Sequence, residues 1–174
     1  YKNRDLSSSQ FPQKIGHALP EKWDDDKLAR IYAMISNIDD NVKKLFVRLE
    51  ELGQAENTLV LFMVDNGPNT RRFVAGMQGM KTTISEGGVR SPLYLHWPKN
   101  LAAGQTSDRV VAHIDILPTL LEACGVKAPE EVELDGRSFW PLLTQENADW
   151  QDRYITLQTH RGNVPMRYHN FMTR

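Results

Sequence analysis

The chain contains 174 residues, of which 40% are hydrophobic and 25% are charged. Its 21 basic and 22 acidic side chains leave a formal net charge of -1, which argues against binding to nucleic acid or an anionic membrane through bulk charge. The apolar content is too high for a disordered tail, and no apolar run approaches the ~20 residues that cross a bilayer. We therefore expect a globular domain without a nucleic-acid or membrane partner.

The N-terminus and the cysteine content bear on compartment and redox chemistry. The first residues carry neither an initiator Met nor an apolar signal-peptide segment, so we expect an internal piece of a longer chain and predict no compartment. A single cysteine excludes intrachain disulfides and Cys-rich zinc sites. Because Cys124 has Leu120, Leu121 and Val126 nearby, the pattern predicts a small core residue and not a nucleophile.

The first clear element is a long helix. Residues 1–22 are polar and lack periodicity, which predicts an extended arm or loop. From Leu28 to Leu52, apolar residues then recur at steps of three and four, which is typical of one long amphipathic helix. Residues 24–26, all Asp, favour its N-terminus, and Gly53 favours its end. Asp39 lies on the flank of the apolar stripe, where we expect a buried, paired carboxylate and not a metal ligand.

Further elements follow in chain order. The apolar run 58–64 predicts a strand buried on both faces, as in a parallel sheet. A long glycine-rich loop is expected at 65–91 and a second strand at 92–97. A short strand at 109–112 is followed by a helix over 114–123, which is ended by Gly125 and whose first residue could lie as far along as Pro118. Residues 126–150 are expected to be irregular, and residues 154–159 to form a last strand. The fold class is α/β: residues 23–150 form the main domain, and residues 151–174 begin a small C-terminal subdomain.

Asp65-Asn66-Gly67 directly follows the predicted buried strand. Ligands bind at the carboxyl edge of open α/β sheets, and a carboxylate beside an amide oxygen suits Ca²⁺ or Mg²⁺ better than zinc. The alternative is a turn, because Asn-Gly is a strong type I′ hairpin signal. These residues alone do not decide between the metal site and the turn.

The glycine-rich segment 79–90 contains two cations, Lys81 and Arg90. Glycines let backbone N–H groups approach an oxyanion, and a cation balances its charge. A P-loop is excluded, because Met80 stands where that motif requires glycine. Taken alone, the segment is also compatible with an ordinary solvated loop. His113 is interpreted as a structural hydrogen-bonding residue and not as a base.

In combination, these segments resemble the sulfatase family. The resemblance covers about residues 20–145. It rests on Ile38-Asp39-Asp40-Asn41-Val42, Asn57-Thr58-Leu59-Val60, Asp65-Asn66-Gly67-Pro68, Lys81-Thr82 with Glu86-Gly87-Gly88-Val89-Arg90-Ser91-Pro92, His113-Ile114-Asp115-Ile116-Leu117-Pro118-Thr119-Leu120 and Leu134-Asp135-Gly136-Arg137-Ser138, in that order. Several spaced motifs in order are far more specific than any single one.

The resemblance implies a fold and a chemistry. Sulfatases share the alkaline phosphatase-like fold, here a partial mixed or mostly parallel sheet flanked by helices, and are often periplasmic, secreted or lysosomal. They hydrolyse sulfate esters with a formylglycine nucleophile and one Ca²⁺, sometimes assigned as Mg²⁺. By position, Asp65 and Asn66 match metal ligands and Lys81 matches the lysine that contacts the sulfate. The segment from Glu86 to Arg90 matches residues that shape the loop.

The sequence also departs from the family pattern. The Cys/Ser-x-Pro-x-Arg motif is absent from these 174 residues, so we expect them to be inactive alone and to self-associate through an exposed sheet edge. Two alternatives remain open: a phosphate or phosphonate ester hydrolase of the same superfamily, and a non-catalytic module that binds sulfated glycans through Arg71, Arg72, Lys81 and Arg90. The substrate, whether a small molecule or a glycan sulfate ester, is not predicted.

Overall fold

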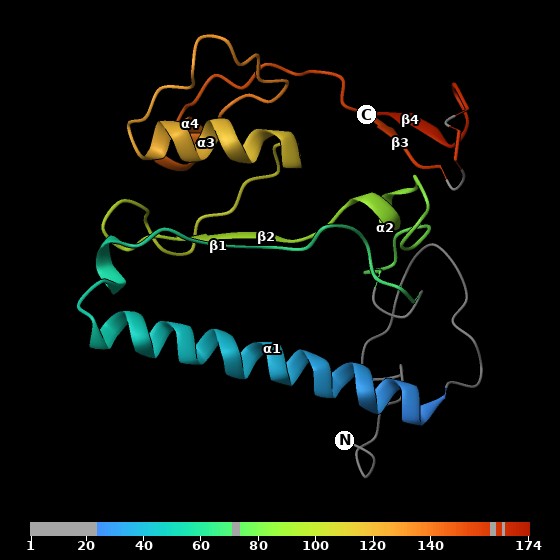
Figure 1. Ribbon diagram of the computed structural model, residues 1–174, viewed down its shortest axis with the longest axis horizontal. Coiled ribbons are helices and arrows are strands. Elements are labelled where there is room, and N and C mark those ends of the chain that lie inside the picture. The colour runs from blue at the N-terminus through green and yellow to red at the C-terminus, as the bar shows by residue number, and fades with distance from the viewer. Residues whose placement is uncertain (1–23, 71–73, 161–162, 165) are drawn as a thin grey trace.

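The computed structural model describes residues 24–70, 74–160, 163–164 and 166–174. The predicted arm at 1–22 lies outside this range. The helices and strands, labelled in Figure 1, are α1 (Asp25–Glu51), β1 (Val60–Met63), α2 (Glu86–Val89), β2 (Leu93–His96), α3 (Ile116–Ala123), α4 (Trp140–Thr144), β3 (Thr156–Gln158) and β4 (Phe171–Thr173). Single 3₁₀ turns occur at Ala55–Asn57 and His113–Asp115.

Helix α1 confirms the long predicted helix and its ends. The side chain of Asp24 accepts a hydrogen bond from the backbone N–H of Lys27 at 3.1 Å, which satisfies one of the free donors of the first turn. Gly53 follows the last turn with φ +64° and donates to the carbonyl of Glu50 at 2.9 Å. A glycine with positive φ is a common end of a helix, because a Cβ atom makes this backbone conformation sterically unfavourable for other residues.

The main layer is a ladder of two strands with helices on both sides (Figure 1). Strands β1 and β2 pair antiparallel, in a register that runs from Val60 opposite His96 to Met63 opposite Leu93. Phe46 of α1 meets the ring of His96 edge-on at 5.3 Å on one side. The indole rings of Trp97 and Trp140 lie 5.8 Å apart and connect the end of β2 to α4. Helix, strand and helix layers make this an α/β arrangement.

Two details of the predicted sheet are different in the structure. Both ladders within the described residues are antiparallel, so the parallel neighbour expected for residues 58–64 is not among them. Phe62 is 41% exposed, so β1 is not buried on both faces. The apolar run correctly predicted a strand, but such a run does not determine which segment pairs with it.

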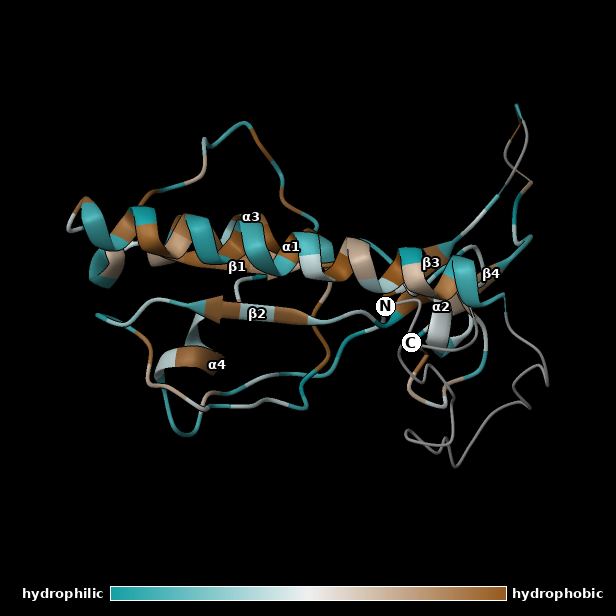
Figure 2. Cartoon of the chain, turned by 90° about the horizontal axis from the view of Figure 1, so that it is seen from below, coloured by the Kyte–Doolittle hydropathy of each residue, from teal (hydrophilic) through white to brown (hydrophobic). Residues whose placement is uncertain are grey.

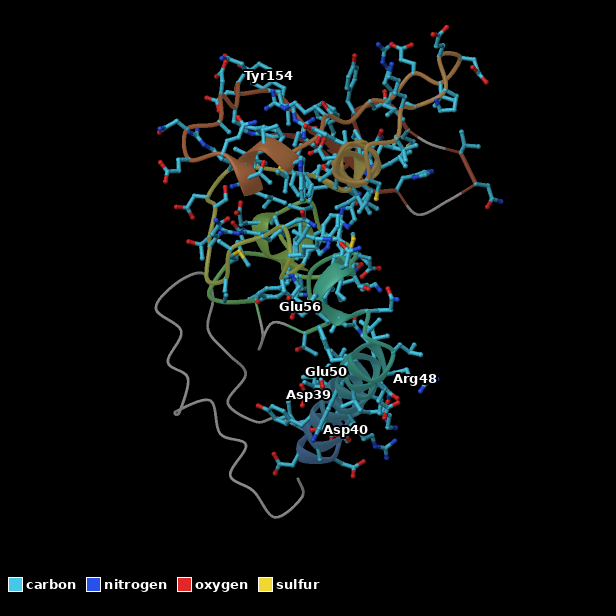
Figure 3. All side chains as sticks on the ribbon, turned by 90° about the vertical axis from the view of Figure 1, so that its left-hand side faces the viewer. Asp39, Asp40, Arg48, Glu50, Glu56 and Tyr154 are labelled. Atoms are coloured by element: carbon cyan, nitrogen blue, oxygen red, sulfur yellow. The ribbon has the colours of Figure 1, made fainter. Side chains whose placement is uncertain are left out.

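The apolar stripe of α1 is only partly covered. Figure 2 shows apolar and polar residues alternating along α1. Leu28 and Ala29 are buried, whereas four large apolar side chains of the stripe are exposed: Ile35, Ile38, Leu45 and Leu52. Met34 and Val47, which lie beside the stripe, are exposed as well. Asp39 is exposed and makes no ion pair within the described residues, so the predicted buried, paired carboxylate is wrong (Figure 3). Because no other described segment covers this part of the helix, the Asp39 carboxylate is solvated and needs no charged partner.

Several predictions for the second half of the chain are corrected. Residues 109–112 form no strand, and Cys124 is exposed at the C-terminal end of α3, so it is not a core residue. Helix α3 begins at Ile116 and tolerates Pro118, because a first-turn proline lacks only an N–H that has no intrahelical acceptor. The segment 126–150 contains the unpredicted α4. Whether a short helix such as α4 forms, and whether Cys124 is covered, depends on contacts with distant segments. The local sequence pattern does not predict these contacts.

The C-terminal residues form a small hairpin. Strand β3 lies within the predicted strand 154–159, and it pairs antiparallel with the unpredicted β4, from Thr156 opposite Thr173 to Gln158 opposite Phe171. Arg174 exchanges two backbone hydrogen bonds with Ile155, at 2.9 and 2.7 Å. No described helix is long and apolar enough to cross a membrane.

A buried carboxylate, Asp115, joins α3 to the segments that follow it. Its side chain is 0% exposed and accepts hydrogen bonds from the backbone N–H groups of Ala112, at 2.8 Å, and Arg137, at 2.9 Å. It also forms an ion pair with Arg153. His113 is exposed, and its side chain makes no hydrogen bond to a described residue, so the structural role predicted for it belongs to Asp115.

Candidate functional site at the carboxyl end of β1

The site begins where β1 leaves the sheet. The backbone N–H of Val64 donates to the carbonyl of Pro92 at 3.3 Å, and the hydroxyl of Ser91 donates to the carbonyl of Val64 at 2.6 Å. These bonds fix the chain one residue before Asp65, which is exposed, and Asn66, which is half-buried. The candidate pair therefore lies at the carboxyl end of β1, the position that the sequence predicted.

The two side chains interact with each other. The amide Nδ2 of Asn66 donates to Oδ1 of Asp65 at 2.7 Å and approaches the carbonyl of Gly67 at 3.4 Å. Neither Asn66 nor Gly67 has a positive φ, which excludes the type I′ turn, because that turn requires positive φ at both central residues. The amide nitrogen is occupied by these contacts, so the amide oxygen of Asn66 and Oδ2 of Asp65 remain as ligand atoms.

This pair of oxygens fits part of a site for a hard cation. Ca²⁺ takes about six to eight oxygen ligands and Mg²⁺ takes six, from carboxylates, amides and waters. The part of the chain that the structure describes contains no cluster of three or more His, Cys, Asp or Glu side chains suited to a metal. Asp65 and Asn66 are thus suited to two positions of a coordination shell that needs further ligands.

Three glycines allow the surrounding loops to approach each other closely. The N–H of Gly67 donates to the carbonyl of Gly88 at 2.9 Å, and a Cβ atom at Gly67 would lie 1.8 Å from the carbonyl oxygen of Gly87. A Cβ at Gly88 would lie 2.2 Å from the carbonyl oxygen of Thr83. Only residues without a side chain permit this contact, which explains the glycine-rich composition of the loop.

Lys81 is held beside the same strand end by its backbone. Its N–H donates to the carbonyl of Pro68 at 2.9 Å, two residues beyond Asn66. The turn behind it is closed by Thr83, whose N–H donates to the carbonyl of Met80 at 3.0 Å and whose hydroxyl donates to the same carbonyl at 2.8 Å. The Lys81 side chain is exposed and makes no ion pair with a described residue. The structure therefore brings Lys81 to the end of β1 that carries Asp65 and Asn66.

The charges behind the loop are paired. The Glu86 carboxylate accepts hydrogen bonds from Arg174, the last residue after β4, and from Arg90 at 3.3 Å. The Arg174 guanidinium holds the pKa of Glu86 below its ordinary value of 4.5, with Arg90 acting in the same direction and partial burial opposing both. The role of Arg174 was not predicted, because it lies 88 residues from Glu86. Of the cations proposed to bind a glycan, Arg71 and Arg72 lie outside the described residues.

The Glu86 pair predicts a specific pH dependence. A carboxyl group whose folded-state pKa is depressed stabilises the fold above its unfolded-state pKa, and this contribution disappears as the pH falls through the folded-state value. We expect the unfolding free energy of Glu86→Gln to decline less than that of the unmodified chain as the pH falls from about 5 to about 3. Urea denaturation across this range measures the difference.

A matched control is Glu131→Gln, since Glu131 is exposed and makes no ion pair within the described ranges. The control should follow the unmodified pH dependence. Identical curves for the Glu86 variant and the unmodified chain would show that the Glu86 pair does not stabilise the fold.

Comparisons with known proteins agree in sequence and in structure. The sulfatase family model matches residues 5–126. The chain is 35% identical to N-acetylgalactosamine-6-sulfatase of Mus musculus over 138 residues, 76% of this chain and 26% of the relative. It is 40% identical to arylsulfatase A of Homo sapiens over 114 residues, 63% of this chain and 22% of the relative. The chain thus spans about a quarter of the length of the curated relatives it matches.

Solved structures show the same fold. The structure of BT4656 in complex with its substrate D-glucosamine-2-N,6-O-disulfate superposes with a TM-score of 0.59 at 26% identity, covering 75% of this chain and 26% of that one. Phosphonate monoester hydrolase from Silicibacter pomeroyi gives a TM-score of 0.58 at 27% identity, covering 75% and 25%. The fold is thus the alkaline phosphatase-like α/β type of these enzymes, represented in part. With a family match over most of its length, the chain belongs to the sulfatase family.

Proposed function

We propose that a longer protein containing this chain hydrolyses sulfate esters, with Lys81 as a catalytic residue and with Asp65 and Asn66 as ligands of a divalent cation. The observation that carries the proposal is the 2.9 Å hydrogen bond from the Lys81 N–H to the carbonyl of Pro68, because it brings the backbone of a cationic residue to the strand end that carries two hard oxygen ligands. A cation and hard ligands side by side suit a tetrahedral oxyanion. Family membership makes a sulfate ester the preferred substrate.

Each residue has a defined task in this proposal. Oδ2 of Asp65 and the amide oxygen of Asn66 would hold Ca²⁺ or Mg²⁺, and this ion would neutralise negative charge on the sulfate. The Lys81 ammonium donates a hydrogen bond to a sulfate oxygen or protonates the leaving oxygen. Glu86 and Arg90 pair with each other and therefore support the loop without contacting the substrate. The nucleophile, a formylglycine, would come from a Cys/Ser-x-Pro-x-Arg motif that these residues do not contain.

The metal ligands are tested with 4-nitrophenyl sulfate. The full-length protein should hydrolyse this ester, lose the activity in EDTA and regain it with CaCl₂. Asp65→Ala should raise the Ca²⁺ concentration needed for half-maximal reactivation, because one carboxylate ligand is lost. Asp108→Ala is the control, since Asp108 is exposed and makes no ion pair within the described residues. Equal reactivation by Ca²⁺ in the Asp65 and Asp108 variants would refute the proposed ligand.

The 174 residues alone provide a second test. We expect them to show no turnover, because they contain no nucleophile motif, and to bind Ca²⁺ weakly in calorimetry, because two oxygens are far fewer than the six to eight that Ca²⁺ prefers. Turnover by the purified chain, or tight binding at a single site, would contradict this division of the active site.

A phosphate or phosphonate ester hydrolase is the second candidate. The similarity to phosphonate monoester hydrolase, at a TM-score of 0.58, favours it, because a cation beside hard ligands suits either oxyanion. The family match and the names of the sequence relatives rank it below the sulfatase. A phosphonate monoester hydrolysed with a higher kcat/KM than 4-nitrophenyl sulfate would reverse this ranking.

A further inference from the structure

A cavity of about 160 Å³ lies between the Lys81 loop and the β3–β4 hairpin. The loop contributes Thr82 to its lining, and the hairpin contributes His160, His169 and Asn170. The hairpin also contributes apolar surface from Met166. With Thr159, which also lines it, the cavity combines residues that carry two imidazoles, two hydroxyls and an amide with a small apolar area, in a place that the sequence did not single out.

The hairpin side of this cavity is held by specific hydrogen bonds. The amide of Gln158 donates to the carbonyls of Met166, at 2.7 Å, and His169, at 3.2 Å. The N–H of Thr159 donates to the carbonyl of Asn170 at 3.0 Å. Together these bonds fix the backbone of His169 and Asn170 across the hairpin from β3. The cavity wall is thus positioned by the strand pair.

The hairpin and the Lys81 loop share one support, the short helix α2. Glu86 at its start pairs with Arg174 at the end of the hairpin. Gly87, the next residue, donates its N–H to the carbonyl of Gln78 at 2.7 Å, just before the turn that carries Lys81. The cavity wall and the proposed sulfate contact are therefore anchored to adjacent residues of the same helix.

Thr82 connects the cavity to the proposed active site. It directly follows Lys81, so the two Cα atoms lie about 3.8 Å apart. Its φ is +76°, an uncommon conformation for a β-branched residue, which costs energy and must be held by its surroundings. The residue proposed to contact the sulfate is thus followed directly in the chain by one that lines the cavity.

We propose that this cavity binds the sugar ring of a sulfated glycan, with His160, His169 and Asn170 as specificity-determining residues. The inference rests on the proposed function, since it assigns a substrate class to that site. Imidazole, amide and hydroxyl groups match the hydroxyls and the 2-substituent of a hexosamine. A flat aryl or sterol group would need a mainly apolar or aromatic wall, whereas this cavity offers only Met166 and Val164.

The test compares a sugar substrate with an aryl substrate in the full-length protein. For His169→Ala and, separately, His160→Ala, we expect KM for D-glucosamine 6-sulfate to rise about 10-fold, because a hydrogen bond to the ring is lost. The kcat/KM for 4-nitrophenyl sulfate should stay within about 2-fold, because its ring makes no such bond. His113 is an exposed histidine outside the cavity, so His113→Ala should change neither KM for the sugar ester nor kcat/KM for 4-nitrophenyl sulfate.

The outcomes separate this inference from the proposed function. Equal effects on both substrates, or an unchanged KM for the sugar in both histidine variants, would refute the sugar subsite while hydrolysis itself persists. Absence of hydrolysis of both esters by the unmodified protein would refute the sulfatase proposal. Circular dichroism melting curves that match the unmodified protein would show that the variants fold.

Discussion

Replacement of Lys81 by alanine in the full-length protein is expected to lower kcat/KM for 4-nitrophenyl sulfate by about 10²- to 10³-fold, the usual loss when one donor to a developing oxyanion is removed. Lys81 is exposed and its backbone hydrogen bond to Pro68 persists in alanine, so the loop should keep its position. Steady-state kinetics provide the measurement, and an unchanged melting temperature shows that the loss is chemical and not structural.

Two further variants sharpen this test. Lys127→Ala removes an exposed lysine far along the chain from the site and should leave kcat/KM unchanged. Lys81→Arg keeps the charge but presents a planar fork in place of a compact ammonium, so we expect only partial activity. Full activity of Lys81→Ala, or an equal loss in the Lys127 variant, would exclude Lys81 as a sulfate contact.

Among the substitutions considered for this chain, removal of the Asp115 carboxylate should cause the largest loss of unfolding free energy. Asp115→Ala leaves Arg153 without its ion-pair partner and two backbone N–H groups without their acceptor. Breaking a buried pair in this way costs about 3–5 kcal/mol, which is a large share of the stability of a small domain. Urea denaturation of the 174-residue chain, monitored by circular dichroism, measures the change in unfolding free energy.

The controls for Asp115 separate charge from shape. Asp135→Ala removes an exposed carboxylate from the same region and should change the unfolding free energy by less than about 0.5 kcal/mol. Asp115→Asn keeps an acceptor oxygen of similar shape but loses the charge, so we expect an intermediate loss. A loss of less than about 1 kcal/mol for Asp115→Ala would show that the buried pair does not join these segments.

The helices show what local patterns are able to predict. The period of apolar residues, the aspartates at 24–26 and Gly53 predicted the existence of α1 and both of its ends, because helix formation depends on neighbours within one or two turns. The same stripe did not predict that Ile35 and Ile38 would be exposed, because burial depends on which other segment covers the helix. The predictions for Cys124 and Asp39 are wrong for the same reason.

For the candidate site too, some features were predictable from the sequence and others were not. Their position after the apolar run 58–64 and their chemistry made Asp65 and Asn66 candidate metal ligands, and the resemblance to the sulfatase family made Lys81 a candidate sulfate contact. The hydrogen bond that brings Lys81 to Pro68, the exclusion of the type I′ turn, and the Glu86–Arg174 pair emerged only from the tertiary structure. These contacts join residues that are distant in the chain or depend on backbone angles.

By itself the sequence determined the α/β class, the long helix α1, the strand before Asp65 and the family to which the chain belongs. It did so because periodicity, capping and motif spacing are local properties of the chain. Only the tertiary structure decided that β1 pairs antiparallel with β2, that Asp115 is the buried junction, and that His160 and His169 line one cavity with Thr82. Those features depend on the path of the chain, which sets the contacts between distant segments. The local sequence of one segment does not determine which other segment it contacts.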